Sequence, residues 1–198
     1  MADNGVNRGR RRFLTLTTTA VGAVGVGFLA VPFIKSWNPS AQARAAGAPV
    51  EADVSKVAEG QALRVKWRGK PILVVHRTQR MLDTLPKLND QLRDPKSEET
   101  TQQPSYCQNL QRSIKPEYFV FVNICTHLGC SPEYVPEPGA KPYNPDWLGG
   151  FFCPCHGSMY DLAARVFKGV PAPLNMVVPP YHYIDKNRIL VGEDPKGA

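Results

Sequence analysis

The sequences CTHLGC, at residues 125–130, and CPCHGS, at residues 153–158, decide the fold of this 198-residue chain. They hold four of its five cysteines and two of its four histidines. Thiolates and imidazoles at such short spacing can converge on one small metal centre, as zinc and iron-sulfur ligation both require. The sequence therefore predicts that two loops of a small domain form a metal site together.

The number of candidate ligands bears on which metal is bound. A zinc site uses four ligands, whereas the two loops offer six candidates. One Cys and one His from each loop give the patterns Cys-x-His and Cys-x-x-His, and they leave Cys130 and Cys155 as a surplus pair that an oxidising compartment would join. Two thiolates and two imidazoles are the ligand set of a Rieske [2Fe-2S] centre. A zinc site stays the alternative.

At this point the chain resembles a known family. CTHLGC followed by CPCHGSMYD, at residues 153–161, is similar to the Rieske iron-sulfur subunit of ubiquinol-cytochrome c reductase, the cytochrome bc complex. The segment VVHRT at residues 74–78, the N-terminal leader and the linker after it are similar too, so the resemblance covers nearly the whole chain. It implies a disulfide between Cys130 and Cys155 and one Rieske [2Fe-2S] cluster, whose ligands would be Cys125, His127, Cys153 and His156.

Further residues receive roles from the same resemblance. Ser158 and Tyr160 occupy positions whose hydroxyls bond a bridging sulfide and a ligand cysteine, which raises the reduction potential by stabilising the extra negative charge of the reduced cluster. Leu128 matches an apolar shield over the cluster. A proline-rich covering loop is expected at Gly169, Val170, Pro171, Ala172 and Pro173, where Val170 interrupts the commoner Gly-Pro-Ala-Pro.

The resemblance implies an electron-transfer function within quinol-cytochrome-c reductase. The high-potential cluster would take one electron from ubiquinol at the quinol-oxidation site of cytochrome b and pass it to cytochrome c1. His156 is the expected catalytic residue, because its imidazole would accept the proton. A dimeric membrane complex is implied in the same way.

The positive charge of the chain lies mainly in its leader. Residues 1–48 hold six of the 24 Lys and Arg residues and one of the 17 Asp and Glu residues, so residues 49–198, with 18 basic and 16 acidic residues, carry only +2. That balance is too nearly neutral for a surface that binds phosphates by net charge. We therefore expect no nucleic-acid partner.

The leader predicts a membrane anchor. Residues 13–34 contain no charge and would form about 33 Å of helix, enough for a hydrocarbon core of ~30 Å. Four arginines precede this stretch, so the basic leader at 1–12 is expected in the cytoplasm. The transmembrane anchor is expected at 13–37 in a bacterial inner membrane, with the head in the periplasm. The run RRRFL at residues 10–14 resembles a twin-arginine signal, which exports folded proteins. Ala41-Gln42-Ala43 resembles a cleavage site, but we favour an uncleaved anchor.

The rest of the chain predicts a flexible hinge linker with little structure at 38–49 and a mostly β head at 50–198. We expect an antiparallel β-sandwich with a cluster-binding subdomain at about 120–178 and a helical insertion. The expected strands are 50–57, 62–68, 70–77, 117–124, 181–185 and 188–192. Two hairpins are expected among them, one hinged at Gly69 and one around Lys186-Asn187. The expected helix carries a core stripe of Met81, Leu85, Leu88 and Leu92.

Residues 95–116 are polar and are expected to be irregular. Cys107 within them is expected to be a free thiol that could form an intermolecular bridge. His76 and His182 are expected to be ordinary sheet residues.

Three rival functions remain open. A Rieske small subunit of another periplasmic oxidoreductase, such as arsenite oxidase, can share the export signal and both loops. Rieske ferredoxin or oxygenase domains are cytoplasmic and lack the extra cysteine pair. A zinc-stabilised binding module is the third, and its metal content would distinguish it.

Overall fold

A computed structural model describes residues 5, 7–140, 146–195 and 197. The chain divides into two compact units, residues 1–45 and residues 46–198. The first unit contains the 29-residue helix α1 (Arg8–Ser36), which begins where the Asn7 side chain accepts a hydrogen bond from the backbone N–H of Arg10 at 3.1 Å. Its side chains are exposed, including Phe28 at 76%. An apolar helix with no buried face is typical of a membrane span.

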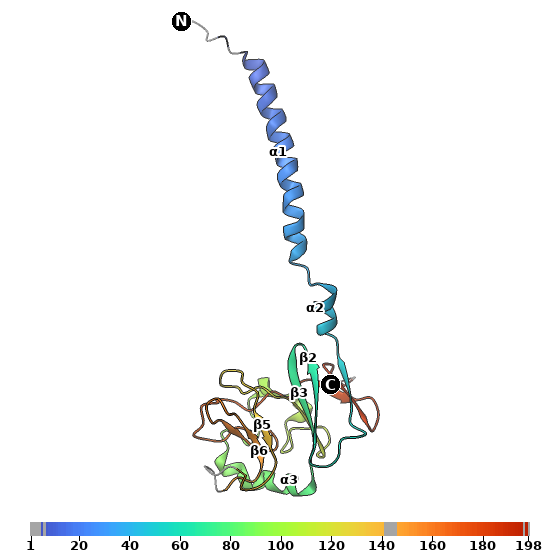
Figure 1. Cartoon of the computed structure of the whole chain (residues 1–198), viewed down its shortest axis with the longest axis vertical. Helices are drawn as coiled ribbons and strands as arrows, with labels where there is room; N and C mark the ends of the chain where they lie inside the picture. Colours follow the sequence, from blue (N-terminus) through green and yellow to red (C-terminus); the bar gives the residue numbers. More distant parts are fainter. Residues whose placement is uncertain (1–4, 6, 141–145, 196, 198) are drawn as a thin grey trace. The chain divides into compact units, whose positions relative to one another are not determined.

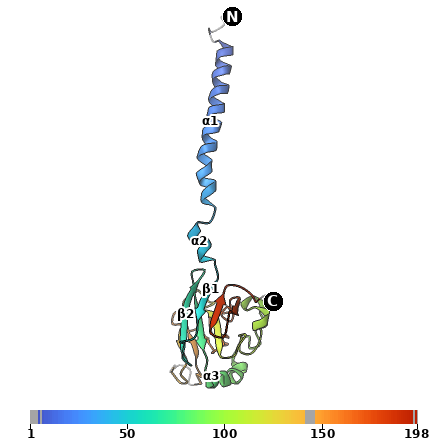
Figure 2. The same ribbon diagram turned by 90° about the vertical axis from the view of Figure 1, so that its right-hand side faces the viewer.

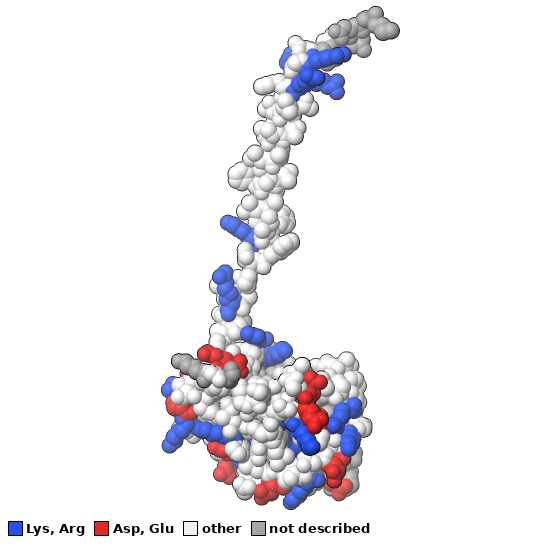
Figure 3. Space-filling view, turned by 180° about the vertical axis from the view of Figure 1, so that it is seen from behind, with Lys and Arg blue, Asp and Glu red and all other residues white. Residues whose placement is uncertain are grey.

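Three of the threonines of α1, Thr15, Thr17 and Thr18, bond to carbonyls of their own helix. The hydroxyls of Thr17 and Thr18 donate to the carbonyls of Phe13 and Leu14 at 2.9 and 2.8 Å. Hydrogen bonds made within the helix remove the need for water, which a hydrocarbon core does not supply. These three threonines are therefore compatible with the predicted span. Figure 3 shows the basic cluster at the start of α1 and both signs of charge on the visible face of the head.

The expected lack of structure at 38–49 is wrong for half of that linker. Residues Ala41–Ala46 form the short helix α2. Its sequence, AQARAA, contains four alanines, which have the highest helix propensity, and Ser40 caps it by accepting the Ala43 N–H at 3.1 Å. The Pro, Gly and small residues around this stretch had favoured an unstructured linker.

The head consists of three small antiparallel sheets (Figures 1 and 2). Each sheet has three strands. The first sheet has the order β1 (Val50–Asp53), β9 (Arg188–Val191), β8 (Tyr181–Tyr183). The second has the order β2 (Ala62–Trp67), β3 (Lys70–His76), β4 (Tyr118–Val122). The third has the order β5 (Glu133–Val135), β6 (Gly150–Phe152), β7 (Met159–Tyr160). The predicted β head is confirmed.

The predicted hairpins are confirmed, with strands shorter than expected. Trp67 pairs with Lys70, and the two residues between them, Arg68 and Gly69, have φ of 49° and 75°. Two successive positive φ angles are typical of the tight turn that matches the twist of a hairpin. The strand expected at 50–57 ends at Asp53, and the strand expected at 117–124 covers Tyr118–Val122.

The apolar stripe forms core contacts, but not one regular helix. Met81, Leu85, Leu88 and Leu92 are all buried, as expected. The α-helix α3 (Gln79–Thr84) gives way to the 3₁₀ helix η1 (Leu85–Gln91). Pro86 lies in the first turn of η1 and has no N–H to donate back to α3, which explains the change.

The insertion at 95–116 is irregular, as expected, but several of its polar side chains are buried. It contains two short 3₁₀ turns, η2 (Thr100–Gln102) and η3 (Ser105–Cys107). Its buried polar side chains are Ser97, Gln102, Gln103, Arg112 and Ser113. The insertion therefore forms part of the interior of the head.

Candidate metal centre

The first ligand loop, residues 125–130, follows β4 and closes on itself. The N–H of Cys125 donates to the carbonyl of Cys130 at 2.7 Å, and the N–H of Gly129 donates back to Cys125 at 3.0 Å. Gly129 has φ of 85°, a conformation that favours glycine. Asn123 anchors the base of the loop through its amide group, which donates to Pro132 O at 3.0 Å.

The second ligand loop, residues 153–158, connects β6 and β7 and has the same closure. The N–H of Gly157 donates to the carbonyl of Cys153 at 3.0 Å, and Gly157 has φ of 73°. The N–H of Cys153 donates to Ser158 O at 2.8 Å. In each loop, therefore, a glycine four residues after the first cysteine turns the chain back over that cysteine.

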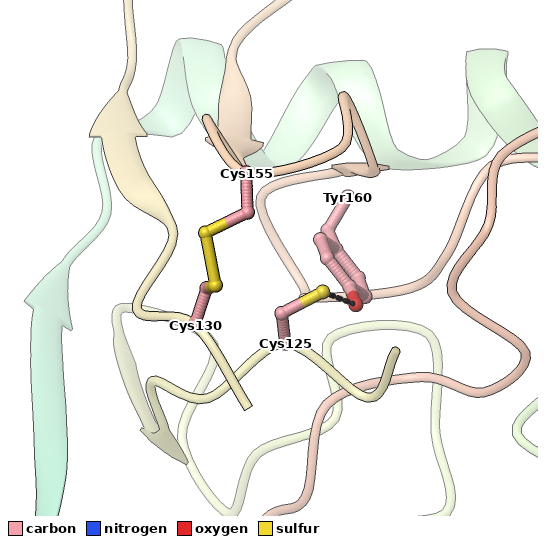
Figure 4. The surroundings of a disulfide bond; sticks show 4 residues. All are labelled: Cys125, Cys130, Cys155 and Tyr160. Atoms are coloured by element: carbon pink, nitrogen blue, oxygen red, sulfur yellow. Dashed lines mark hydrogen bonds between the residues drawn. A yellow bond between two sulfur atoms is a disulfide. The ribbon is translucent and has the colours of Figure 1, made fainter. Parts of the chain in front are cut away.

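A disulfide between Cys130 and Cys155 joins the two ligand loops, as Figure 4 shows, and its Cα atoms are 6.7 Å apart. The predicted pairing is confirmed. The Sγ atoms of Cys130, Cys153 and Cys155 all lie within 4.8 Å of one another. Because the disulfide consumes two of these sulfurs, only the thiol of Cys153 in this group is free to bind metal.

The remaining candidate donors form two pairs. Cys125 and Cys153 are free and buried, and the Cys153 thiol lies within hydrogen-bonding reach of Cys125. The rings of His127 and His156 meet edge to face, with centroids 4.8 Å apart. The structure thus brings the two predicted ligand thiols together and the two predicted ligand imidazoles together, each pair with one member from each ligand loop.

The environments of these donors fit a metal cluster. Within the described part of the chain, Nδ1 of His127 is buried and has no hydrogen-bond partner. Such an orphaned nitrogen requires a partner, and a metal ion is one that imidazole commonly takes. Burial raises the pKa of the Cys153 thiol, and contact with Cys125 raises it further. Metal binding would overcome this rise, since metals bind the thiolate. Two sulfurs and two imidazoles match the Rieske donor set.

Tyr160 lies against the first ligand loop (Figure 4). Its hydroxyl donates to Sγ of Cys125 at 3.2 Å and accepts from the N–H of Thr126 at 3.1 Å. Burial raises the pKa of this phenol, so it stays protonated and able to donate. Thr126 was not identified from the sequence. Its Oγ1 lies 3.2 Å from the Tyr160 hydroxyl and donates to the Leu174 carbonyl at 2.7 Å. A threonine between Cys125 and His127 is not a metal-ligand type, so nothing in the sequence was a reason to select it.

Ser158 is fully buried and contacts the expected covering loop, residues 169–173. Its hydroxyl oxygen accepts the N–H of Ala172 at 3.1 Å, and that bond does not use the hydroxyl proton. Ala172 is buried, whereas Pro171 and Pro173 are exposed. Val170, the residue that interrupts the expected motif, is half-buried against the core. The covering loop therefore lies beside the second ligand loop.

Two exposed side chains flank the donors. Leu128 is 71% exposed, and His156 is also exposed, whereas the His127 ring is half-buried. The imidazole of His156 is thus the more accessible of the two. Leu128, in the first ligand loop, offers an exposed apolar side chain.

The other histidines and the fifth cysteine lie elsewhere. Nδ1 of His76 is 2.7 Å from the Val57 carbonyl, and its ring stacks on Tyr118, as expected of a sheet residue. His182 lies in β8. Cys107 is free, as predicted, but it is fully buried. The expected ability of Cys107 to form an intermolecular bridge is therefore wrong for the folded chain.

Comparisons with known proteins cover the whole chain. A model described as "Rieske [2Fe-2S] domain" matches residues 48–181, and one described as "Ubiquitinol-cytochrome C reductase Fe-S subunit TAT signal" matches residues 1–40. The "Ubiquinol-cytochrome c reductase iron-sulfur subunit" of Allochromatium vinosum is 60% identical over 198 residues, covering 100% of this chain and 95% of the relative. The protein of the same description from Rhodospirillum rubrum is 46% identical, covering 92% and 91%. A solved chain described as "Hyperthermophilic respiratory Complex III" is 26% identical with a TM-score of 0.48, covering 88% of this chain and 98% of that one.

Proposed function

Because the chain belongs to the Rieske iron-sulfur subunits of ubiquinol-cytochrome c reductase, we propose that its two ligand loops together hold the [2Fe-2S] cluster of that family. The proposed ligands are Cys125, His127, Cys153 and His156. The observation that carries this assignment is that two disulfide-linked loops present a pair of buried free thiols and a pair of facing imidazoles, one of which has an orphaned buried nitrogen.

Family membership decides between the rival functions. The chain is the electron-transfer Rieske subunit of the cytochrome bc complex, a membrane-anchored part of ubiquinol-cytochrome c reductase. A zinc-stabilised module, an oxygenase ferredoxin and an arsenite oxidase subunit are therefore set aside. When bound, the cluster supplies one-electron redox chemistry at a potential that imidazole ligands raise.

His156 is the residue that we propose for the proton. Its ring is exposed, so the nitrogen that does not bind metal is accessible to a quinol hydroxyl. Loss of an electron acidifies a quinol, and an imidazole nitrogen within reach is suited to take the proton. Leu128, which is exposed in the first ligand loop, would contribute an apolar contact for the quinone ring.

The partners that we propose are cytochrome b, where ubiquinol would bind, and cytochrome c1, which would receive the electron, in a dimeric complex. The basic residues before α1 support a cytoplasmic N-terminus and a periplasmic head in the bacterial inner membrane. The domain boundaries that we propose are the leader at 1–12, the anchor at 13–37, the hinge linker at 38–49, and the head at 50–198 with its cluster-binding subdomain at about 120–178.

Electron paramagnetic resonance after ascorbate reduction tests the ligand assignment. We expect a Rieske signal from the full chain and its loss in His156→Ala, together with loss of quinol oxidation by the complex. His182→Ala is the matched control, because His182 lies in a different sheet and should leave the signal unchanged.

The thiols allow an independent comparison. Cys125→Ser should abolish the signal, whereas Cys107→Ser, which changes an equally buried free cysteine, should retain it. A normal Rieske signal in either His156→Ala or Cys125→Ser contradicts the assignment. So does a native protein that contains zinc and no iron.

A further inference from the structure

Three arginine side chains are buried inside the head: Arg77, Arg112 and Arg165. Asp161 is the one carboxylate buried with them among the described residues, and it pairs with Arg165. Neither of the other two arginines forms an ion pair within the part of the chain that the structure describes. A buried charge without a counterion is costly unless hydrogen bonds satisfy it, so the acceptors that these two guanidinium groups have found are informative.

Those acceptors include the carbonyls of the 161–165 loop. Arg77 donates to Leu162 O at 3.3 Å. Arg112 donates from one nitrogen, Nη1, to the carbonyls of Ala163 and Ala164 at 3.1 and 3.3 Å. The loop is thus held from outside by two guanidinium groups that come from distant parts of the sequence.

Arg112 is itself fixed by the insertion at 95–116. Its Nη2 donates to Gln102 O at 3.1 Å and to Oε1 of Gln103 at 3.0 Å. The Ala164 carbonyl that it binds belongs to a residue with φ of 55°, a conformation disfavoured for a side chain with a Cβ atom. The guanidinium therefore stabilises a strained backbone that the loop would otherwise tend to leave. Burial lowers the pKa of Arg112 to about 10, which leaves it charged at neutral pH.

The 161–165 loop is the direct continuation of the strand that carries Tyr160. The chain turns back so that Val166 forms an isolated bridge with Tyr160, and Asp161 N donates to Arg165 O at 3.0 Å. Asp161 and Arg165 also form a buried ion pair across the loop. A displacement of this loop would be passed to the backbone of Tyr160, and from there to its hydroxyl on Cys125.

We propose that Arg112 is a positioning residue for the cluster: by holding the 161–165 loop, it keeps the Tyr160 hydroxyl on the Cys125 sulfur and so raises the reduction potential. A hydroxyl that donates to a ligand sulfur stabilises the additional negative charge of the reduced state. This inference rests on the proposed function, because it takes Cys125 as a ligand. It gives the insertion a role in tuning the site.

The decisive variant is Arg112→Lys, which keeps the charge but loses the planar fork that reaches two carbonyls and two further acceptors. The measurement is the midpoint potential of the full chain in its complex, from a redox titration followed by the Rieske signal. We expect a lower potential in Arg112→Lys, and no further lowering when the same change is made in a Tyr160→Phe background. Arg188→Lys is the control, since Arg188 is exposed in β9, and it should leave the potential unchanged.

Hydrogen exchange supplies a second readout that does not depend on the cluster. The amides of Ala163 and Arg165, which donate to Oδ1 of Asp161, should exchange faster in Arg112→Lys. If this variant does not assemble, Gln103→Met, which removes a single acceptor of Arg112, should lower the potential in the same direction by a smaller amount.

An unchanged potential in the lysine variant overturns the inference, and so does an equal lowering in both backgrounds, which would mean that Arg112 does not act through Tyr160. If Arg112→Lys does not assemble, an unchanged potential in Gln103→Met overturns it as well. Failure of the proposed function is a different result, because the native chain would then give no Rieske signal at all.

Discussion

Cys130 and Cys155 form a covalent link between the two loops that carry all four proposed ligands. Each loop supplies one thiol and one imidazole, so the relative position of the loops sets the shape of the donor set. The disulfide fixes that position next to the site, and the two residues lie 25 positions apart in sequence.

Replacing both cysteines with serine should therefore destabilise the head and weaken cluster retention. Closing a loop of this length contributes ~3 kcal/mol in the chain-entropy account. We expect the thermal midpoint to fall on the order of 10 °C for a domain of this size. Calorimetry and the intensity of the Rieske signal would measure the two effects. Cys107→Ser, which breaks no disulfide, is the control, and equal stability of the double variant and this control contradicts the prediction.

The buried pair of Asp161 and Arg165 gives a second prediction. Asp161→Asn leaves three buried arginines without a buried carboxylate, and breaking a buried ion pair from one side costs about 3–5 kcal/mol. The denaturation midpoint of the head should fall accordingly. Asp185→Asn removes a carboxylate from an exposed pair with Arg188 and should change it little. Similar losses in the two variants would show that burial of the pair is unimportant.

Cys107 gives a prediction for pH. Burial raises the pKa of its thiol from 9.0 to about 11, so the folded chain keeps the proton at a pH where the unfolded chain loses it. Stability from this group is therefore complete below pH 9 and is lost as the pH rises to about 11. Half-buried groups such as Tyr134 act in the same direction, so the contribution of Cys107 is the difference in stability between the native chain and Cys107→Ser. Parallel stability profiles for the two proteins between pH 8 and 11 would exclude it.

The same burial should protect Cys107 from alkylation. At pH 8 only ~0.1% of a thiol with this pKa is ionised, and the thiolate is the reactive form. Iodoacetamide should modify Cys107 only after unfolding, as mass spectrometry of the protein would reveal. Rapid modification of the folded chain would show that the insertion opens.

The linker gives a prediction for electron delivery. Ala43→Pro together with Ala45→Pro should restrict the backbone around α2, because proline fixes φ and removes a backbone donor. If the head moves between its partners, reduction of cytochrome c1 should slow while the Rieske signal and potential stay the same. Stopped-flow spectroscopy of the complex measures this rate, with Ala43→Ser as the control. An unchanged rate contradicts a role for linker motion.

The sequence predicted the two ligand loops better than it predicted the buried side chains that hold the neighbouring backbone in place. The four proposed donors and the surplus cysteine pair lie in two short motifs, and local spacing was sufficient to predict two metal-binding loops with a disulfide between them. Arg77, Arg112 and Arg165 come from distant segments, and arginine is usually exposed, so no local pattern indicated that they would be buried together.

Secondary structure shows the same division between local and tertiary information. The hairpin hinge at Gly69 follows from local preferences and was predicted, whereas Arg68 was expected in the strand and lies in the turn. The helical spacing of Met81 to Leu92 was correct for burial but did not reveal that Pro86 would change the helix type. The alanines of α2 were read as a linker because their short run lies between Pro39 and Gly47.

The bridge between the ligand loops also has a consequence for the maturation of the protein. Disulfides persist in oxidising compartments and are rare in the cytosol. A head that crosses the membrane already folded would therefore leave the cytoplasm with Cys130 and Cys155 reduced. The disulfide that joins the two loops would form only after the head has reached the periplasm. Biogenesis of the centre would then be completed in two compartments, and the last covalent bond would form after export.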